Sequence, residues 1–260
     1  MSQHLLFIKD LSISLIDNNG RRIIVDSINL QVKHRNIVAL VGASGSGKTT
    51  VGLAVMRLLP SAMRVNKGAV FFDGRNLMEY SIDHMRILRG SQIGMVFQEP
   101  LNAFNPVFRI GFQIEEVLLF HTNLNRRQRK ARVLELLQLV GLPDPKRAAS
   151  AYPHQLSGGM RQRAMIAQAI AGNPKLIIAD EPTSSLDVTL QARIIELFKM
   201  LREKLGIAIL LITHDIAMVS HMADDVVVMH AGKVVETGSM KQILTSPREE
   251  YTIELLDACV

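Results

Sequence analysis

The sequence predicts an α/β fold in which helices cover a parallel β-sheet. Three short apolar runs rich in β-branched residues indicate its strands, at residues 36–41, 175–180 and 207–213. Continuous apolar runs of this length are typical of strands that are buried on both faces. Each run is followed by a candidate helix. Two further patterns predict an N-terminal antiparallel sheet and an inserted helical segment.

The clearest of these helices spans residues 188–205. Its apolar residues recur at helical spacing, and those near one face are Ile194, Leu197, Phe198, Leu201 and Leu205. Because this helix joins two of the buried runs, we expect a βαβ unit with the usual right-handed crossover.

The N-terminal part alternates apolar and polar residues in the segments 5–15, 21–32 and 68–77. The segments are separated by turn residues, among them Asn18, Asn19, Gly20 and Gly74. This pattern predicts an antiparallel sheet that leans on the parallel core.

The last part of the chain predicts another strand pair over residues 226–238, with its turn at Ala231 and Gly232, followed by a short helical tail.

The middle of the chain, from residue 100 to about 172, has no strand signal, and its apolar residues recur at helical spacing. We therefore expect one domain over residues 1–260. Residues 1–98 and 173–260 are predicted to form the core with its antiparallel sheet, and residues 99–172 an inserted helical subdomain.

The chain has 30 Lys and Arg against 24 Asp and Glu, which gives a net charge of +6. Its densest basic cluster, residues 125–132, runs into apolar residues at helical spacing, so we interpret it as the solvated start of a helix. No aromatic residues interleave with this cluster to stack on bases, so we expect no nucleic-acid partner.

Cys259 is the single cysteine, so we expect neither a disulfide framework nor a cluster of thiolate ligands. No apolar run approaches the roughly 18 residues that a membrane-spanning helix needs. We therefore expect any membrane role to come through a partner.

The segment LVGASGSGKTT, residues 40–50, follows the first buried run and leads into a helical pattern. It has the spacing G-x-x-x-x-G-K-[ST] of a loop whose backbone N–H groups cradle phosphates at a helix N-terminus. In this pattern Lys48 reaches the β- and γ-phosphates of a nucleotide, and Thr49 binds Mg²⁺. The predicted nucleotide-binding residues of this loop are Gly42, Ala43, Ser44, Gly45, Ser46, Gly47, Lys48, Thr49 and Thr50.

Two adjacent carboxylates, Asp180 and Glu181, end the second buried run. Doubly wound sheets bind their ligands at the carboxyl ends of the strands. Taken alone, the two acids could simply cap a helix. With the phosphate loop upstream, we expect Asp180 to hold Mg²⁺ through water and Glu181 to polarise a water for attack on the γ-phosphorus.

His214 ends the third buried run, and Gln98 follows the strand-like segment IGMVF at residues 93–97. In isolation such a His can satisfy a backbone carbonyl, and a single Gln carries no information. Together with the loop, His214 is predicted to contact the γ-phosphate, and the Gln98 amide to contact both the metal ion and the attacking water. The predicted metal ligands are Thr49, Gln98 and Asp180.

Ser157, Gly158 and Gly159 precede another helical pattern, so the chain has a second helix N-terminus suited to an anion. One triphosphate cannot easily use both. We therefore predict that two nucleotide-binding chains pack head to tail, and that each offers its LSGGM segment to the nucleotide on the other chain's Lys48 loop.

Together these motifs resemble the ATP-binding subunit of an ABC transporter, which is a P-loop NTPase. The family's Walker A motif is matched by GASGSGKT, its Q-loop by Gln98, its signature by LSGGM, its Walker B motif by LIIAD with Glu181, its D-loop by SSLD and its switch histidine by His214. The resemblance implies a RecA-like core, ATP and Mg²⁺ as cofactors, Glu181 as the catalytic base, and Asp187 as a link between two composite sites.

A narrower resemblance is carried by FQEPLNAFNPVFRIGFQIEEVL, YPHQLSGGMRQRAMIAQAI and DEPTSSLDVTLQARI. These segments are similar to the peptide and nickel uptake branch of the family. That branch implies a second ATP-binding subunit, identical or different, two permease subunits and an extracytoplasmic solute-binding protein. It also implies a peripheral location on the cytoplasmic face of the inner membrane. The transported solute stays open between peptides, nickel chelates and other small solutes.

One feature departs from the family. Its ATPases usually stack an aromatic residue of the N-terminal sheet on adenine, but no Phe, Tyr or Trp occurs between Phe7 and Phe71. Arg21 or Arg22 is then the candidate to stack as a cation over the purine ring.

The alternative is a soluble ABC ATPase that acts on ribosomes or DNA. Translation-type relatives usually carry two cassettes in one chain, and repair types split the cassette with a long coiled coil. Neither feature is present in this sequence. A nucleotide sensor without turnover would require an altered Glu181 or His214, and both are intact. We therefore favour a transport ATPase.

Overall fold

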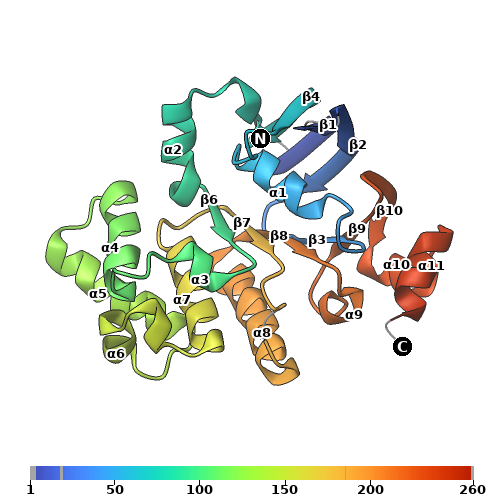
Figure 1. Cartoon of the computed structure of the whole chain (residues 1–260). Helices are drawn as coiled ribbons and strands as arrows, with labels where there is room; N and C mark the ends of the chain where they lie inside the picture. Colours follow the sequence, from blue (N-terminus) through green and yellow to red (C-terminus); the bar gives the residue numbers. More distant parts are fainter. Residues whose placement is uncertain (1–3, 18–19, 185, 259–260) are drawn as a thin grey trace. The chain divides into compact units, whose positions relative to one another are not determined.

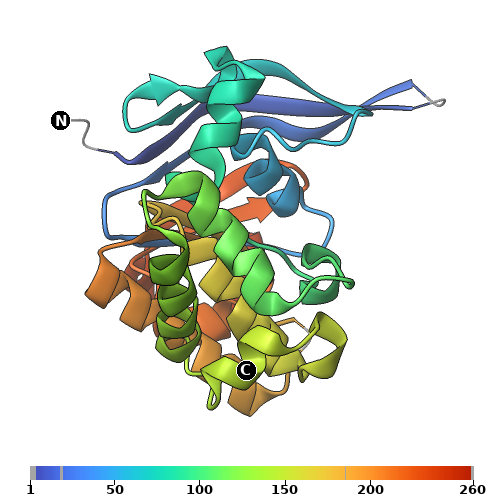
Figure 2. The same cartoon turned by 90° about the vertical axis from the view of Figure 1, so that its left-hand side faces the viewer.

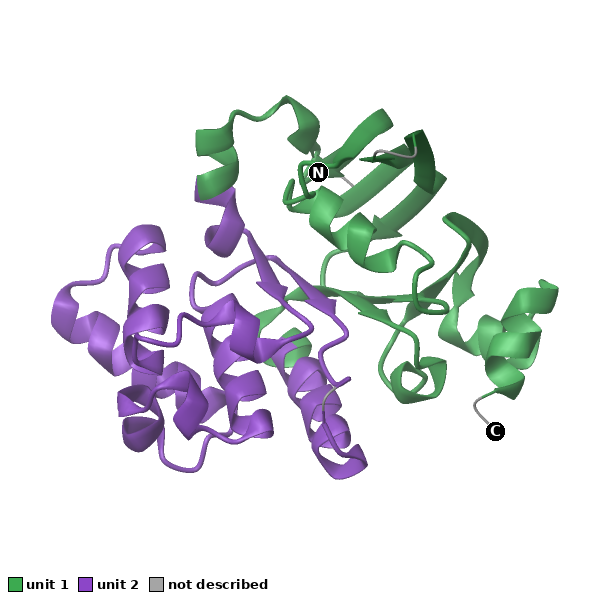
Figure 3. Ribbon diagram, viewed as in Figure 1, with its two compact units in different colours: residues 1–86, 202–260 green, residues 87–201 purple. Residues whose placement is uncertain are grey.

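The computed structural model describes residues 4–17, 20–184 and 186–258. The chain forms two compact units, residues 1–86 with 202–260 and residues 87–201 (Figure 3). Asn18 and Asn19 of the predicted turn, Ser185 of the SSLD segment and Cys259 lie outside the described residues.

An antiparallel sheet forms the N-terminal part of the first unit, as predicted. Its strands run in the order β2-β1-β4-β5, and they are β1 (Leu6–Asp17), β2 (Gly20–Val32), β4 (Met63–Phe72) and β5 (Arg75–Asn76). Figure 2 shows β1 and β2 as two long neighbouring strands. Strand β4 begins five residues before the predicted segment. Its first residues, Met63 to Asn66, also alternate apolar and polar side chains, and they pair with β1, as Met63 does with Leu15.

A second set of strands in the first unit has the order β10-β9-β3-β8. Strands β3 (Ile37–Val41), β8 (Ala208–Thr213) and β9 (Asp225–His230) are parallel, and β10 (Lys233–Ser239) returns antiparallel to β9. Every residue of β3 and β8 is buried, which explains why both read as continuous apolar runs.

The helical elements of the first unit follow these strands (Figure 1). They are α1 (Lys48–Val55), η1 (Leu77–Glu79), α9 (Ile216–Val219), α10 (Met240–Thr245) and α11 (Glu250–Asp257). Helices α2 (Ile82–Ser91) and α8 (Val188–Leu205) contribute residues to both units. Four of the five residues on the predicted apolar face of α8 are buried. Leu205, the last residue of the helix, is 41% exposed.

The second unit contains a pair of buried parallel strands, β6 (Ile93–Val96) and β7 (Leu176–Asp180). Between them the chain is helical, as predicted. The helices are α3 (Pro100–Ala103), α4 (Ile110–His121), α5 (Arg126–Leu139), α6 (Pro145–Ser150), η2 (Pro153–Gln155) and α7 (Gly158–Ile170).

The basic cluster at residues 125–132 starts α5, as predicted. Asn125 accepts the Gln128 N–H at 3.0 Å, and the Gln128 side chain accepts the Asn125 N–H at 2.9 Å, which forms a reciprocal cap. Within residues 4–17, 20–184 and 186–258, no helix is both long and apolar enough to span a membrane.

Candidate functional site

The phosphate loop begins where β3 ends and leads directly into α1, whose first residue is Lys48. Gly42 has φ +153° and Gly47 has φ +100°. A Cβ atom on Gly42 would lie 2.0 Å from the carbonyl oxygen of Met229, and one on Gly47 would lie 2.9 Å from that of Ile24. Both the backbone conformation and the close approach therefore require glycine at these two positions.

Lys48 folds back over its own loop. Its side chain is buried, and Nζ donates to the carbonyl oxygens of Gly42 at 2.8 Å and Ala43 at 2.9 Å. The N–H groups of Gly45 and Gly47 donate no hydrogen bond to any group that the structure describes. The loop thus presents an ammonium group and unpaired N–H donors at a helix N-terminus, which is the chemistry that binds phosphate oxygens.

The other predicted residues of the loop differ in how far they are exposed to solvent. Ala43, Ser44, Gly45 and Thr49 are exposed, whereas Ser46 and Thr50 are buried. The exposed Thr49 lies in the first turn of α1, which is where the motif needs its hydroxyl group.

The sheet brings His214 close to this loop. Val41 pairs in parallel register with Thr213 of β8, so Gly42 and His214 both follow neighbouring strands at their carboxyl ends. The His214 side chain is exposed. The next residue, Asp215, caps α9 by accepting the Met218 N–H at 2.8 Å, which fixes the chain just after the histidine.

In the second unit, Gln98 and the two carboxylates meet at one end of a strand pair. Val96 of β6 pairs with Ala179 of β7, and Gln98 follows β6 by two residues. Gln98 is exposed, whereas Asp180 and Glu181 are only 4% and 9% exposed. The structure thus places all three residues at or just after the carboxyl ends of two paired strands within this unit.

Glu181 has an uncommon backbone conformation, with φ +45°. For a residue other than glycine this left-handed conformation costs about 1–2 kcal/mol. The Glu181 carbonyl oxygen accepts the N–H of Ser184 at 3.3 Å and its hydroxyl at 3.2 Å, which holds the turn. Strain of this kind clusters at functional sites, so it adds to the argument for a chemical role of Glu181.

The SGG segment starts helix α7. Ser157 caps it by accepting the Met160 N–H at 3.3 Å, and its own side chain is exposed. Gly158 is half-buried and Gly159 is buried; a Cβ on Gly159 would lie 3.1 Å from a methyl group of Leu190. The segment therefore packs on the start of α8, where Asp187 accepts the Leu190 N–H at 2.9 Å.

The two candidate adenine contacts lie on β2. Arg21 and Arg22 are both exposed, and Arg21 Nε donates to the Ser14 hydroxyl at 3.2 Å. Arg22 pairs with Leu15 in the sheet.

Comparison with known proteins identifies the family. Residues 25–184 match the family model of the ABC transporter. This chain belongs to that family.

Curated relatives of this ABC protein include peptide-transport subunits. It is 45% identical to the oligopeptide transport ATP-binding protein OppD of Bacillus subtilis, over 97% of this chain and 71% of that protein. It is 46% identical to the dipeptide transport ATP-binding protein DppD of Escherichia coli, over 98% of this chain and 78% of that protein. These relatives confirm the predicted resemblance to the peptide branch.

A solved structure also matches this ABC chain. The ATP-binding cassette MJ0796, described as a dimeric post-hydrolysis state bound to ADP and Pi, has a TM-score of 0.81 and 29% identity, over 90% of this chain and 98% of that chain. The predicted P-loop NTPase fold, with its antiparallel and helical parts, is confirmed, and the chain is an ATPase.

Two contacts of the phosphate loop in this ABC ATPase were not predicted. The loop packs on the Met229 carbonyl at the end of β9, and its Ser46 carbonyl accepts the Gly232 N–H at 3.1 Å. Both partners lie far along the chain, and a buried valine-rich strand followed by a turn gives no local signal of such a contact.

Proposed function

We propose that this chain is the ATP-hydrolysing subunit of a bacterial peptide importer, in which two nucleotide-binding subunits share their ATP sites. The sharing of ATP sites is supported by one observation: the chain has two glycine-rich helix N-termini, at Lys48 and at Ser157. One triphosphate needs only one such cradle. The MJ0796 structure, which is described as dimeric, supports the same arrangement.

In this proposal the phosphate loop, residues 42–50, binds the phosphate chain. The N–H groups of Gly45 and Gly47 and the ammonium of Lys48 are the donors. Binding requires Lys48 to exchange its carbonyl partners for phosphate oxygens, which is favourable because an ion pair with a phosphate is stronger than a bond to a neutral carbonyl.

Thr49, Gln98 and Asp180 are the proposed ligands of Mg²⁺. Their hydroxyl, amide and carboxylate groups all offer oxygen, which is the donor that Mg²⁺ prefers, so the donor set fits the ion. No cluster of three or more His, Cys, Asp or Glu groups is found among the residues that the structure describes, which agrees with a site completed by phosphates and water. When bound, the ion would neutralise charge on the phosphate oxygens.

Hydrolysis then requires a positioned water. We assign Glu181 as the base that accepts its proton while the water oxygen bonds to the γ-phosphorus and the bond to the ADP oxygen breaks. The Gln98 amide orients the same water, and His214 contacts the γ-phosphate that is released.

Ser157, Gly158 and Gly159 are assigned to the nucleotide of the partner subunit, with Asp187 linking the two shared sites. Their packing on the start of α8 within one unit supports a common role. We place Ser157, Gly158 and Gly159 in a helical subdomain, residues 99–172, that is inserted into the nucleotide-binding core.

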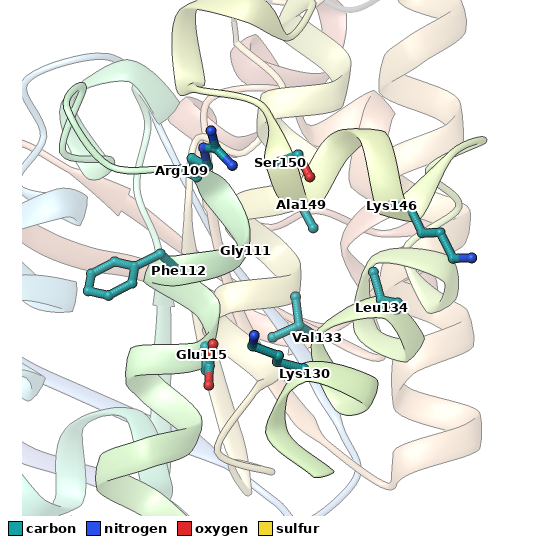
Figure 4. A pocket seen from close by; sticks show the side chains of 10 residues that line it. All are labelled: Arg109, Gly111, Phe112, Glu115, Lys130, Val133, Leu134, Lys146, Ala149 and Ser150. Atoms are coloured by element: carbon teal, nitrogen blue, oxygen red, sulfur yellow. The ribbon is translucent and has the colours of Figure 1, made fainter. Parts of the chain in front are cut away.

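The permease is proposed to dock on the helices of this subdomain. Large apolar side chains are exposed there, and they are Leu101, Val107, Phe108, Phe112, Leu119 and Phe120. Exposed apolar groups at this density are typical of protein contacts. Beside them a cavity of about 350 Å³ opens between α4, α5 and α6, with Phe112, Lys130 and Ser150 in its lining (Figure 4).

The names of the relatives favour peptides as the transported solute, with nickel chelates as the alternative to exclude by experiment. The remaining partners are two permease subunits, a second ATP-binding subunit and an extracytoplasmic solute-binding protein. The chain would then act on the cytoplasmic face of the membrane.

The test is Glu181→Gln in the assembled transporter. Turnover should fall to background while ATP stays bound and traps the dimer, because the amide cannot accept the proton of the attacking water. The matched control is Glu196→Gln, since Glu196 is an exposed acid whose partner is Lys199. Undiminished hydrolysis in the Glu181 variant would refute the assignment of Glu181 as the base. A separate experiment, which compares the uptake of labelled peptide with that of ⁶³Ni²⁺, decides the transported solute.

A further inference from the structure

The C-terminal helix α11 contacts the phosphate loop. The N–H of Ala43 donates to the hydroxyl oxygen of Tyr251 at 2.8 Å, although 208 residues separate the two. Both residues lie in the first unit. Tyr251 therefore connects helix α11 to the loop.

This hydrogen bond involves the same peptide group that holds Lys48. The peptide that joins Gly42 to Ala43 donates its N–H to Tyr251, and its carbonyl oxygen accepts Lys48 Nζ at 2.8 Å. The N–H and C=O of a planar peptide point to opposite sides, so the hydroxyl and the ammonium group fix its two edges.

Tyr251 is itself held from two directions. Its ring lies against that of His230, with the centroids 4.0 Å apart, and His230 ends the strand that supports the loop at Met229. From the other side, the buried carboxylate of Glu236 accepts the N–H groups of Arg248 and Glu249 at 3.0 and 3.2 Å, which anchors the start of α11.

We propose that Tyr251 is a positioning residue of the ATP site. Through the Gly42–Ala43 peptide it fixes the loop conformation in which Lys48 receives the phosphates, so that the docking of α11 sets the affinity for ATP. This inference rests on the proposed role of the loop in binding the nucleotide.

The test is Tyr251→Phe, which keeps the ring against His230 and removes only the hydroxyl. Loss of one ordinary hydrogen bond predicts a Kd for ATP and a KM raised about three- to tenfold, with kcat at saturating ATP unchanged. Hydrogen–deuterium exchange of the loop should show faster exchange at the Ala43 amide. Tyr80→Phe is the control, because Tyr80 also lies beside a histidine, His84, and its hydroxyl bonds to no described residue.

The outcomes are distinct. A lower Tm with unchanged KM and Kd would make Tyr251 a stabilising residue only, and values equal to those of the wild type would overturn the inference. If the wild-type protein itself does not bind ATP, the proposed function fails first. If the wild-type protein binds ATP through Lys48, the Tyr251 variant tests only the role of Tyr251.

Discussion

The packing of the phosphate loop against β9 makes a sharp prediction for two glycines of the same motif. Gly42→Ala places a Cβ 2.0 Å from the Met229 carbonyl oxygen, a backbone atom that cannot rotate away. Gly45→Ala is the matched variant, because its φ is +80° and a Cβ there meets no described heavy atom within 4 Å.

The two costs can be separated. Gly45→Ala carries only the backbone strain, about 1 kcal/mol after subtracting the stabilisation that comes from the lower conformational entropy of the unfolded alanine chain. Gly42→Ala adds the steric overlap, about 1–3 kcal/mol, which brings its total to about 2–4 kcal/mol. For a chain of this size, about 2–4 °C in Tm corresponds to each kcal/mol.

Thermal unfolding followed by circular dichroism, without nucleotide, should therefore show a Tm lower by about 3 °C for Gly45→Ala and by about 6–12 °C for Gly42→Ala. Equal shifts would refute the reasoning, because they would mean that the loop does not press on the β9 carbonyl. A larger fall in Tm for Gly45→Ala than for Gly42→Ala would contradict the predicted order of the two variants.

Two further predictions concern stability. Burial alone would raise the pKa of Glu236, but the Thr252 side chain, the N–H groups of Glu249 and Arg248 and the Arg248 charge together lower it below the ordinary value. A carboxyl with a lowered folded pKa stabilises the protein above its unfolded pKa, and this contribution is lost as the pH falls through the folded pKa. Glu236→Gln should thus lower Tm at pH 7 and flatten the acid limb of the Tm profile, and an unchanged profile would contradict the anchoring of α11. Asn125→Ala should cost about 1 kcal/mol by urea unfolding through loss of the α5 cap, with ATP turnover unaffected.

The sequence could predict the parallel strands because burial on both faces leaves continuous apolar runs, as in β3 and β8. It could predict the phosphate loop because left-handed and crowded positions admit only glycine, as at Gly42 and Gly47. Helix α8 was predicted with its full length, since one apolar face repeats along it.

The contacts that support the loop could not be predicted in this way. The first half of β4 has only Met63 and Val65 as apolar residues before the polar pair Asn66 and Lys67, and it is held by pairing with β1. The Met229 carbonyl and the Tyr251 hydroxyl act over long sequence separations, and neither leaves a pattern in the residues around it. Only the fold reveals that the C-terminal segment holds the loop.

The central claim is that two chains share each ATP site, and Ser157→Arg tests it most directly. Ser239→Arg is the control, because Ser239 is also an exposed helix-capping serine, which accepts the Gln242 N–H at 3.2 Å. If two chains share each site, Ser157→Arg abolishes turnover in the assembled transporter, while the isolated subunit binds ATP as the wild type does. A large loss of ATP binding in the isolated subunit would contradict the claim.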